Sequence, residues 1–128
     1  MTRMLMTVAT FLTLTAAQAA LAPPLDFAGQ WVGTATPRGT TLTEPLALSL
    51  AATPNARKFR GSVTLTAGNT TSCHVVARYR TALLLRATCG GKVSVVVAHY
   101  DPTTGALTGS FPIGHHHTIA DFTLARVG

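Results

Sequence analysis

The chain has 128 residues and a formal net charge of +6, with ten Lys and Arg against four Asp and Glu. So few carboxylates argue against calcium sites, which need several oxygen ligands, and against the paired carboxylates of a glycoside hydrolase. The basic excess is compatible with an anionic polymer of the cell envelope as a partner, and plain solubility is the alternative explanation.

The first twenty residues, MTRMLMTVATFLTLTAAQAA, have the pattern of a secretory signal peptide. Arg3 precedes an apolar run from Met4 to Ala17, and Ala17-Gln18-Ala19 fits a small-x-small cleavage site. The run is too short and too rich in threonine to span a membrane, which needs about 20 apolar residues. We therefore predict a signal peptide at 1–20, a single domain at 21–128 without a membrane span, and export to the periplasm, the cell envelope or the medium.

Beyond the signal peptide, apolar and polar residues alternate with a period of two, which is typical of β-strands. In chain order, the segments with this pattern are 27–36, 42–50, 59–67, 73–80, 82–89, 92–100, 106–113 and 118–127. Short turn-like sequences join them, and about eight such strands can close into a barrel. The sequence therefore predicts an all-β fold, a single antiparallel up-and-down barrel of about eight strands. An immunoglobulin-like sandwich is the alternative, although it uses longer crossovers.

The alternation also predicts which side chains face the barrel interior. In the segment 92–100, it places Val93, Val95, Val97 and His99 inward. The bulky members of the predicted inward set are Trp31, Leu46, Leu48, Phe59, Leu85, Phe111 and Phe122. So much side-chain volume in a small barrel predicts a filled interior.

The two cysteines fit the predicted strand pairing. A hairpin around Thr81 places Cys73 opposite Cys89 on the inward face, close enough for a disulfide. Export to an oxidising compartment favours that bridge. The alternative is a metal-binding pair formed by Cys73 and His74.

Two short motifs carry a resemblance to a known group of proteins. Gly29-Gln30-Trp31 resembles the Gly-x-Trp that opens lipocalins and other calycin-type barrels, and the hairpin YDPTTGALTGSF is similar to late hairpins of avidin-like barrels. In calycins, an Arg near the end of the last strand packs over the Trp, and Arg126 stands at the matching position. The resemblance implies a carrier of a small apolar ligand, or an inhibitor that binds a partner protein at the barrel mouth. Biotin binding is not implied, because avidin-type sites use several tryptophans.

The most specific candidate site is a run of three histidines, His115, His116 and His117, between the last two predicted strands. Imidazole is a common ligand of borderline metals, which favours copper(II) first and zinc second. His74 is a possible fourth ligand, although it lies about three strands, or about 15 Å, away. A polar turn is the alternative. A bound copper would suit metal scavenging or an antioxidant role, with superoxide-type chemistry as the enzymatic option. Binding without turnover is favoured, because only Asp121 offers a nearby carboxylate.

A second candidate site lies at the opposite end of the barrel. The predicted faces bring His99, Tyr79 and Trp31 together there as a small-molecule cleft, and plain core packing is the alternative. Nucleic-acid binding is not favoured, because it needs exposed aromatic side chains. The sequence also lacks a Gly-x-Ser-x-Gly elbow, a His-Glu-x-x-His zinc motif and a phosphate loop.

Overall fold

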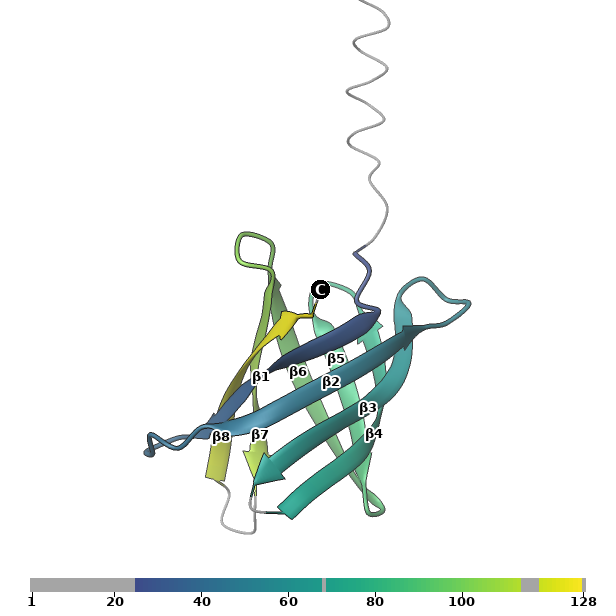
Figure 1. Cartoon of the computed structure of the whole chain (residues 1–128). Helices are drawn as coiled ribbons and strands as arrows, with labels where there is room; N and C mark the ends of the chain where they lie inside the picture. The colour runs from purple at the N-terminus through teal and green to yellow at the C-terminus, as the bar shows by residue number, and fades with distance from the viewer. Residues whose placement is uncertain (1–24, 68, 114–117, 128) are drawn as a thin grey trace, which may run out of the picture.

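The computed structural model describes residues 25–67, 69–113 and 118–127. In these ranges, eight antiparallel strands form a closed barrel and no residue is helical (Figure 1). The strands follow one another around the barrel in chain order: β1 Gly29–Pro37, β2 Glu44–Ala52, β3 Lys58–Ala67, β4 Asn69–Tyr79, β5 Leu83–Cys89, β6 Lys92–Asp101, β7 Ala106–Ile113 and β8 Thr118–Arg126. Among these residues there is no helix that could cross a membrane. The predicted up-and-down barrel is confirmed, and the sandwich is wrong.

The barrel closes because β1 pairs with both β2 and β8. Closure leaves no strand edge open for pairing with another chain. We call the end of the barrel where β1 begins and β8 ends the closed end, and it lies at the top of Figure 1. The opposite end, where β1 ends and β8 begins, is called the open end.

Buried and exposed residues alternate along the strands as the sequence pattern predicts. In β2, for example, Leu46, Leu48 and Leu50 are buried while the residues between them are exposed. The same alternation follows the predicted faces in β4, β5 and β8. One face of each strand therefore builds an apolar interior, and the other face meets solvent.

The prediction for β6 is wrong, because its two faces are reversed. The residues predicted to point inward are exposed: Val93, Val95, Val97 and His99. Gly90 and Gly91 form a two-residue turn with φ of 57° and 84°, as type I′ hairpin turns require. With only two residues between the strands, Cys89 pairs directly with Lys92, so both face inward. The inward face of β6 therefore consists of Lys92, Ser94, Val96, Ala98 and Tyr100.

The predicted disulfide between Cys73 and Cys89 is present. The β4–β5 register pairs Val75 with Ala87 and His74 with Thr88, which brings the two cysteines opposite each other. Their Cα atoms are 4.6 Å apart, close to the separation of about 4.5 Å in a non-hydrogen-bonded antiparallel pair. The bridge therefore links two neighbouring strands near the open end.

Aromatic side chains fill the closed end. Phe27, which precedes β1, is 1% exposed and lies at the centre of this group. Its ring centroid is 4.9 Å from that of Tyr79, 5.5 Å from Tyr100, 6.0 Å from Phe59 and 6.2 Å from Trp31. We call these five residues the aromatic plug.

Arg126 packs against the aromatic plug through its contact with Trp31. Its guanidinium carbon is 4.6 Å from the Trp31 ring centroid, within cation–π range. The same guanidinium donates hydrogen bonds to the carbonyl oxygens of Ala28 (2.8 Å) and Asp26. The indole nitrogen of Trp31 donates to the carbonyl oxygen of Phe27 at 3.0 Å. The contact between Arg126 and Trp31 is the one that the calycin resemblance implies.

Candidate ligand-binding site

The half of the barrel toward the open end contains a cavity of about 490 Å³. Its wall is formed mainly by apolar side chains from β2 to β8: Leu46, Leu48, Val63, Leu65, Val75, Leu85, Ala87, Val96, Phe111, Ile113, Phe122 and Leu124. The cavity reaches the open end, because Thr71, Lys92 and Pro112 line it and are exposed. The Cys73–Cys89 bridge also belongs to its wall.

The cavity shows that the predicted filled interior is wrong. Five of the large aromatic side chains lie together in the aromatic plug, so they fill the closed end and leave the other half of the barrel less filled. The reversal of β6 also places the small side chain of Ser94 in the cavity wall, where the predicted faces had placed valines. Ala87 opposes Ser94 on β5 and is also small. Space therefore remains between the plug and the open end.

The cavity wall carries few polar groups. Thr71 and Ser94 contribute hydroxyls, and Lys92 is the one charged side chain among the lining residues. Lys92 is exposed at the rim, so its ammonium group keeps contact with water. Within the described ranges, no buried side-chain nitrogen or oxygen lacks a hydrogen-bond partner. This arrangement can hold an apolar body inside the barrel and an anionic group at the rim.

The cleft predicted from His99, Tyr79 and Trp31 does not form as one site. His99 is exposed on the outer face of β6. Trp31 is 1% exposed and Tyr79 packs against Phe27, so both belong to the aromatic plug and neither lines the cavity. The cavity lies at the other end of the barrel.

His115, His116 and His117 lie outside the described residues. The strands on either side of them, β7 and β8, end and begin at the open end. His74 is exposed on the outer face of β4, and β5 and β6 separate β4 from β7 in the barrel. Among the residues that the structure describes, no group of three or more His, Cys, Asp or Glu could hold a metal ion. The copper or zinc site stays a prediction from the sequence.

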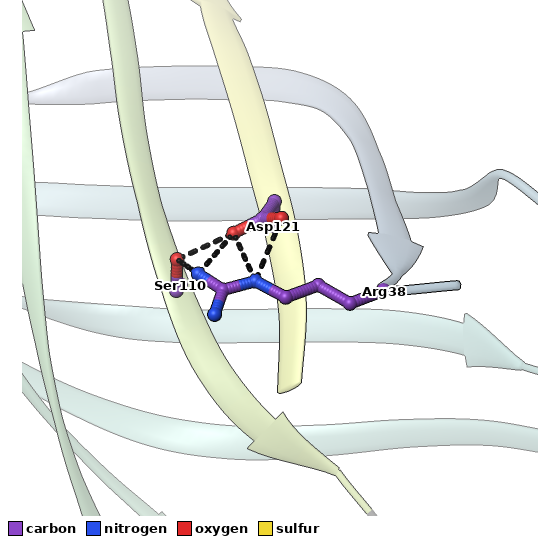
Figure 2. A network of polar contacts seen from close by, with 3 residues as sticks. All are labelled: Arg38, Ser110 and Asp121. Carbon is purple, nitrogen blue, oxygen red and sulfur yellow. Dashed lines mark hydrogen bonds and ion pairs between the residues drawn. The ribbon is translucent and has the colours of Figure 1, made fainter. Parts of the chain in front are cut away.

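Asp121 forms polar contacts on the outer surface near the open end, where Figure 2 shows the guanidinium of Arg38 next to both Asp121 and Ser110. Arg38 donates through Nη2 and Nε to the Asp121 carboxylate at 3.0–3.2 Å, and the Ser110 hydroxyl donates to it at 2.6 Å. The backbone nitrogen of Arg38 donates to the carbonyl oxygen of Ile119. These contacts connect the β1–β2 turn with β7 and β8. The hydrogen bonds from Arg38, and then from Ser110, lower the pKa of Asp121.

We predict that this network stabilises the barrel at neutral pH and is lost in acid. Because the pKa of Asp121 is lower in the folded than in the unfolded protein, its contribution is complete above about pH 4 and disappears as the pH falls through the folded pKa. The difference in melting temperature between the wild type and Asp121→Asn should therefore shrink as the pH falls below 4. The pKa of Asp101 is also lowered, but Asp101 is present in both proteins, so its contribution cancels in the difference between their melting temperatures. A difference that is independent of pH would contradict this account.

Sequence reasoning missed Lys92, Ser94 and Val96 as cavity residues. The Gly90-Gly91 pair indicated that these residues face inward, because a two-residue turn determines which residues of the two strands oppose each other.

No protein-family model matches the sequence, and no curated protein matches it either. The cavity and its lining are therefore the strongest evidence on function.

Proposed function

We propose that the protein is an exported carrier that binds a small, mostly apolar molecule with an anionic end group. The observation that carries the proposal is the cavity of about 490 Å³, with an apolar wall and a single charged side chain, Lys92, at its rim. Ligand sites in proteins typically have volumes of about 300–1,000 Å³ and combine apolar walls with a few placed polar groups. A carboxylate at the rim would meet Lys92 while its chain stays in the apolar wall.

Two further observations support the proposal. The contact of Arg126 with Trp31 follows the pattern of calycin-type barrels, a group that includes small-molecule carriers. The Cys73–Cys89 bridge is typical of proteins in oxidising compartments, which agrees with the signal-peptide pattern of residues 1–20. We infer that the protein binds its ligand after export.

The test is the binding of three twelve-carbon probes, dodecanoate, dodecanol and dodecylamine, to the purified oxidised protein. We expect one molecule bound per barrel, with the highest affinity for dodecanoate, a lower affinity for dodecanol and the lowest for dodecylamine. Calorimetry and native mass spectrometry measure the affinity and the stoichiometry. The change Ala87→Phe places a ring in the cavity, because Ala87 is buried in its wall, and should reduce the affinity for dodecanoate at least about tenfold. Lys92→Met should weaken dodecanoate about two- to fivefold and leave dodecanol unchanged, as expected for one exposed charge pair.

The matched control is Ala47→Phe, the same substitution on the exposed face of β2. It should bind dodecanoate as the wild type does. Thermal unfolding of each variant shows whether it is folded at the temperature of the binding experiment. No binding of any probe by the folded wild type, or equal affinities for Ala87→Phe and Ala47→Phe, would reject the cavity as the binding site.

A further inference from the structure

Charge is distributed unevenly around the barrel. Between Glu44 and Asp101 the chain contains no acidic residue, whereas it contains seven basic ones. Those seven are Arg57, Lys58, Arg60, Arg78, Arg80, Arg86 and Lys92. This part of the sequence forms nearly all of β2, the whole of β3, β4 and β5, and β6 up to Tyr100, so the neighbouring strands β3 to β6 carry positive charge with no carboxylate before Asp101 at the end of β6.

Four of the basic side chains gather on the outer face of β3, β4 and β5. Lys58 stands directly opposite Arg78, a like-charge pair that destabilises a sheet. Arg60 and Arg86 flank Val76 in the next row of the sheet. Among the described residues, the single ion pair joins Arg38 to Asp121, which lies on other elements of the barrel. An anion that binds these four side chains would therefore relieve repulsion.

Apolar side chains stand beside this charge. Val93, Val95 and Val97, on the outer face of β6, are 49%, 59% and 45% exposed. Leu84 on β5 is opposite Val97 and is 44% exposed, and Arg86 is opposite Val95. On β3, the outward positions that carry no basic residue are occupied by serine and threonine. On β6, three neighbouring outward positions are all occupied by valine. We call the surface formed by these apolar residues and the four basic ones the β3–β6 face.

We propose that the β3–β6 face binds the surface of an anionic phospholipid bilayer. Arginine donates paired hydrogen bonds to phosphate groups, and basic residues near an anionic bilayer each favour binding. Valine and leucine side chains beside them can enter the interfacial region of the lipid. A soluble anionic polymer would contact the charges but would gain little from the exposed valines. A second copy of the chain would place positive charge against positive charge. The lipid surface therefore fits both features of the face.

This interaction goes beyond the proposed carrier function and would place the cavity near a source of apolar molecules. Val93 is adjacent in sequence to Lys92, which lies at the cavity rim. The β3–β6 face therefore extends to the open end. Membrane binding and ligand binding depend on different side chains, so each can fail in experiment without the other.

The test is sedimentation of the oxidised protein with vesicles of phosphatidylcholine, either alone or with 30% phosphatidylglycerol, at physiological salt. We expect binding to the anionic vesicles only. Arg60→Gln/Arg78→Gln/Arg86→Gln should weaken it roughly 100-fold, because each basic residue near such a surface contributes about a factor of five. Val93→Thr/Val95→Thr/Val97→Thr should weaken it at least about fivefold. The last variant keeps β-branched side chains at exposed strand positions, so it should fold normally.

The matched control is Val32→Thr/Ile119→Thr, which removes exposed apolar side chains on β1 and β8, away from the β3–β6 face. It should bind anionic vesicles as the wild type does. Three results would overturn the proposal. The first is equal binding to neutral and anionic vesicles. The second is binding to soluble polyglutamate but not to vesicles, which would identify a polymer as the partner. The third is a dimer in light scattering that only the triple valine variant abolishes, which would make the face a contact between two copies.

Discussion

Replacing Phe27 by alanine is expected to lower the free energy of unfolding by about 3–5 kcal/mol, the usual cost of truncating a buried phenylalanine. Phe27 is 1% exposed and contacts four other aromatic rings, so its removal leaves a hole at the centre of the aromatic plug. The carbonyl oxygen that accepts the indole hydrogen bond belongs to the same residue, and its position depends on the ring being anchored. Chemical denaturation followed by tryptophan fluorescence measures both the stability and the surroundings of Trp31.

The control is Leu25→Ala, two residues earlier in the same segment, where the side chain is 42% exposed. It should change the stability by less than about 1 kcal/mol. If Phe27→Ala were no more destabilising than Leu25→Ala, the segment before β1 would not be part of the folded core. Phe27 would then not contribute to the aromatic plug that fills the closed end.

Gly61→Ala is expected to destabilise the barrel by at least about 3 kcal/mol, at or above the upper end of the usual overpacking range. A Cβ atom at Gly61 would lie 1.6 Å from the carbonyl oxygen of Ser49 and 2.7 Å from its carbonyl carbon. Both are backbone atoms of the paired strand β2, so they can move away only if the β2–β3 register is disturbed. A Cβ atom at Gly33 would likewise lie 1.8 Å from the carbonyl oxygen of Thr123 on β8. Close backbone approach of this kind accompanies the strong coiling of a small barrel.

The control for this prediction is Ser62→Ala, the next residue of β3, whose side chain is exposed. Its effect should stay within about 0.5 kcal/mol. Urea denaturation of the two variants gives the comparison. Equal stability of Gly61→Ala and the wild type would mean that β2 and β3 are farther apart than the structure shows.

The strand plan could be predicted from the sequence because the period-two pattern is strong and the turns are short. The opposition of Cys73 and Cys89 followed from the same pattern, since both have the parity of Val75 and Ala87. In β6, hydrophobicity pointed to the wrong face, because its outward positions carry Val93, Val95 and Val97. There the Gly90-Gly91 turn determines the faces and overrides hydrophobicity.

The cavity could not be predicted by adding up inward side chains. Whether a cavity forms depends on where along the barrel axis the bulky side chains lie. Phe27 fills part of the closed end although it precedes β1 and belongs to no strand. The strand pattern contains no information on that packing. The reversal of β6 also changed the expected site, because it moved His99 outside and brought Lys92 to the rim. The three adjacent histidines remain a sequence-based hypothesis, which a copper titration of the wild type beside His115→Ala/His116→Ala/His117→Ala can test.

The most direct measurement of the central claim is a methyl NMR titration of the oxidised protein with dodecanoate. The chain offers an internal comparison, because Val63, Val75 and Val96 line the cavity while valines on the outer face of β6 do not. The carrier account predicts nuclear Overhauser contacts from the ligand chain to the methyl groups of Val63, Val75 and Val96, and none to those of Val95 or Val97. Contacts confined to the outer valines, or the absence of any contact at saturating ligand, would contradict it.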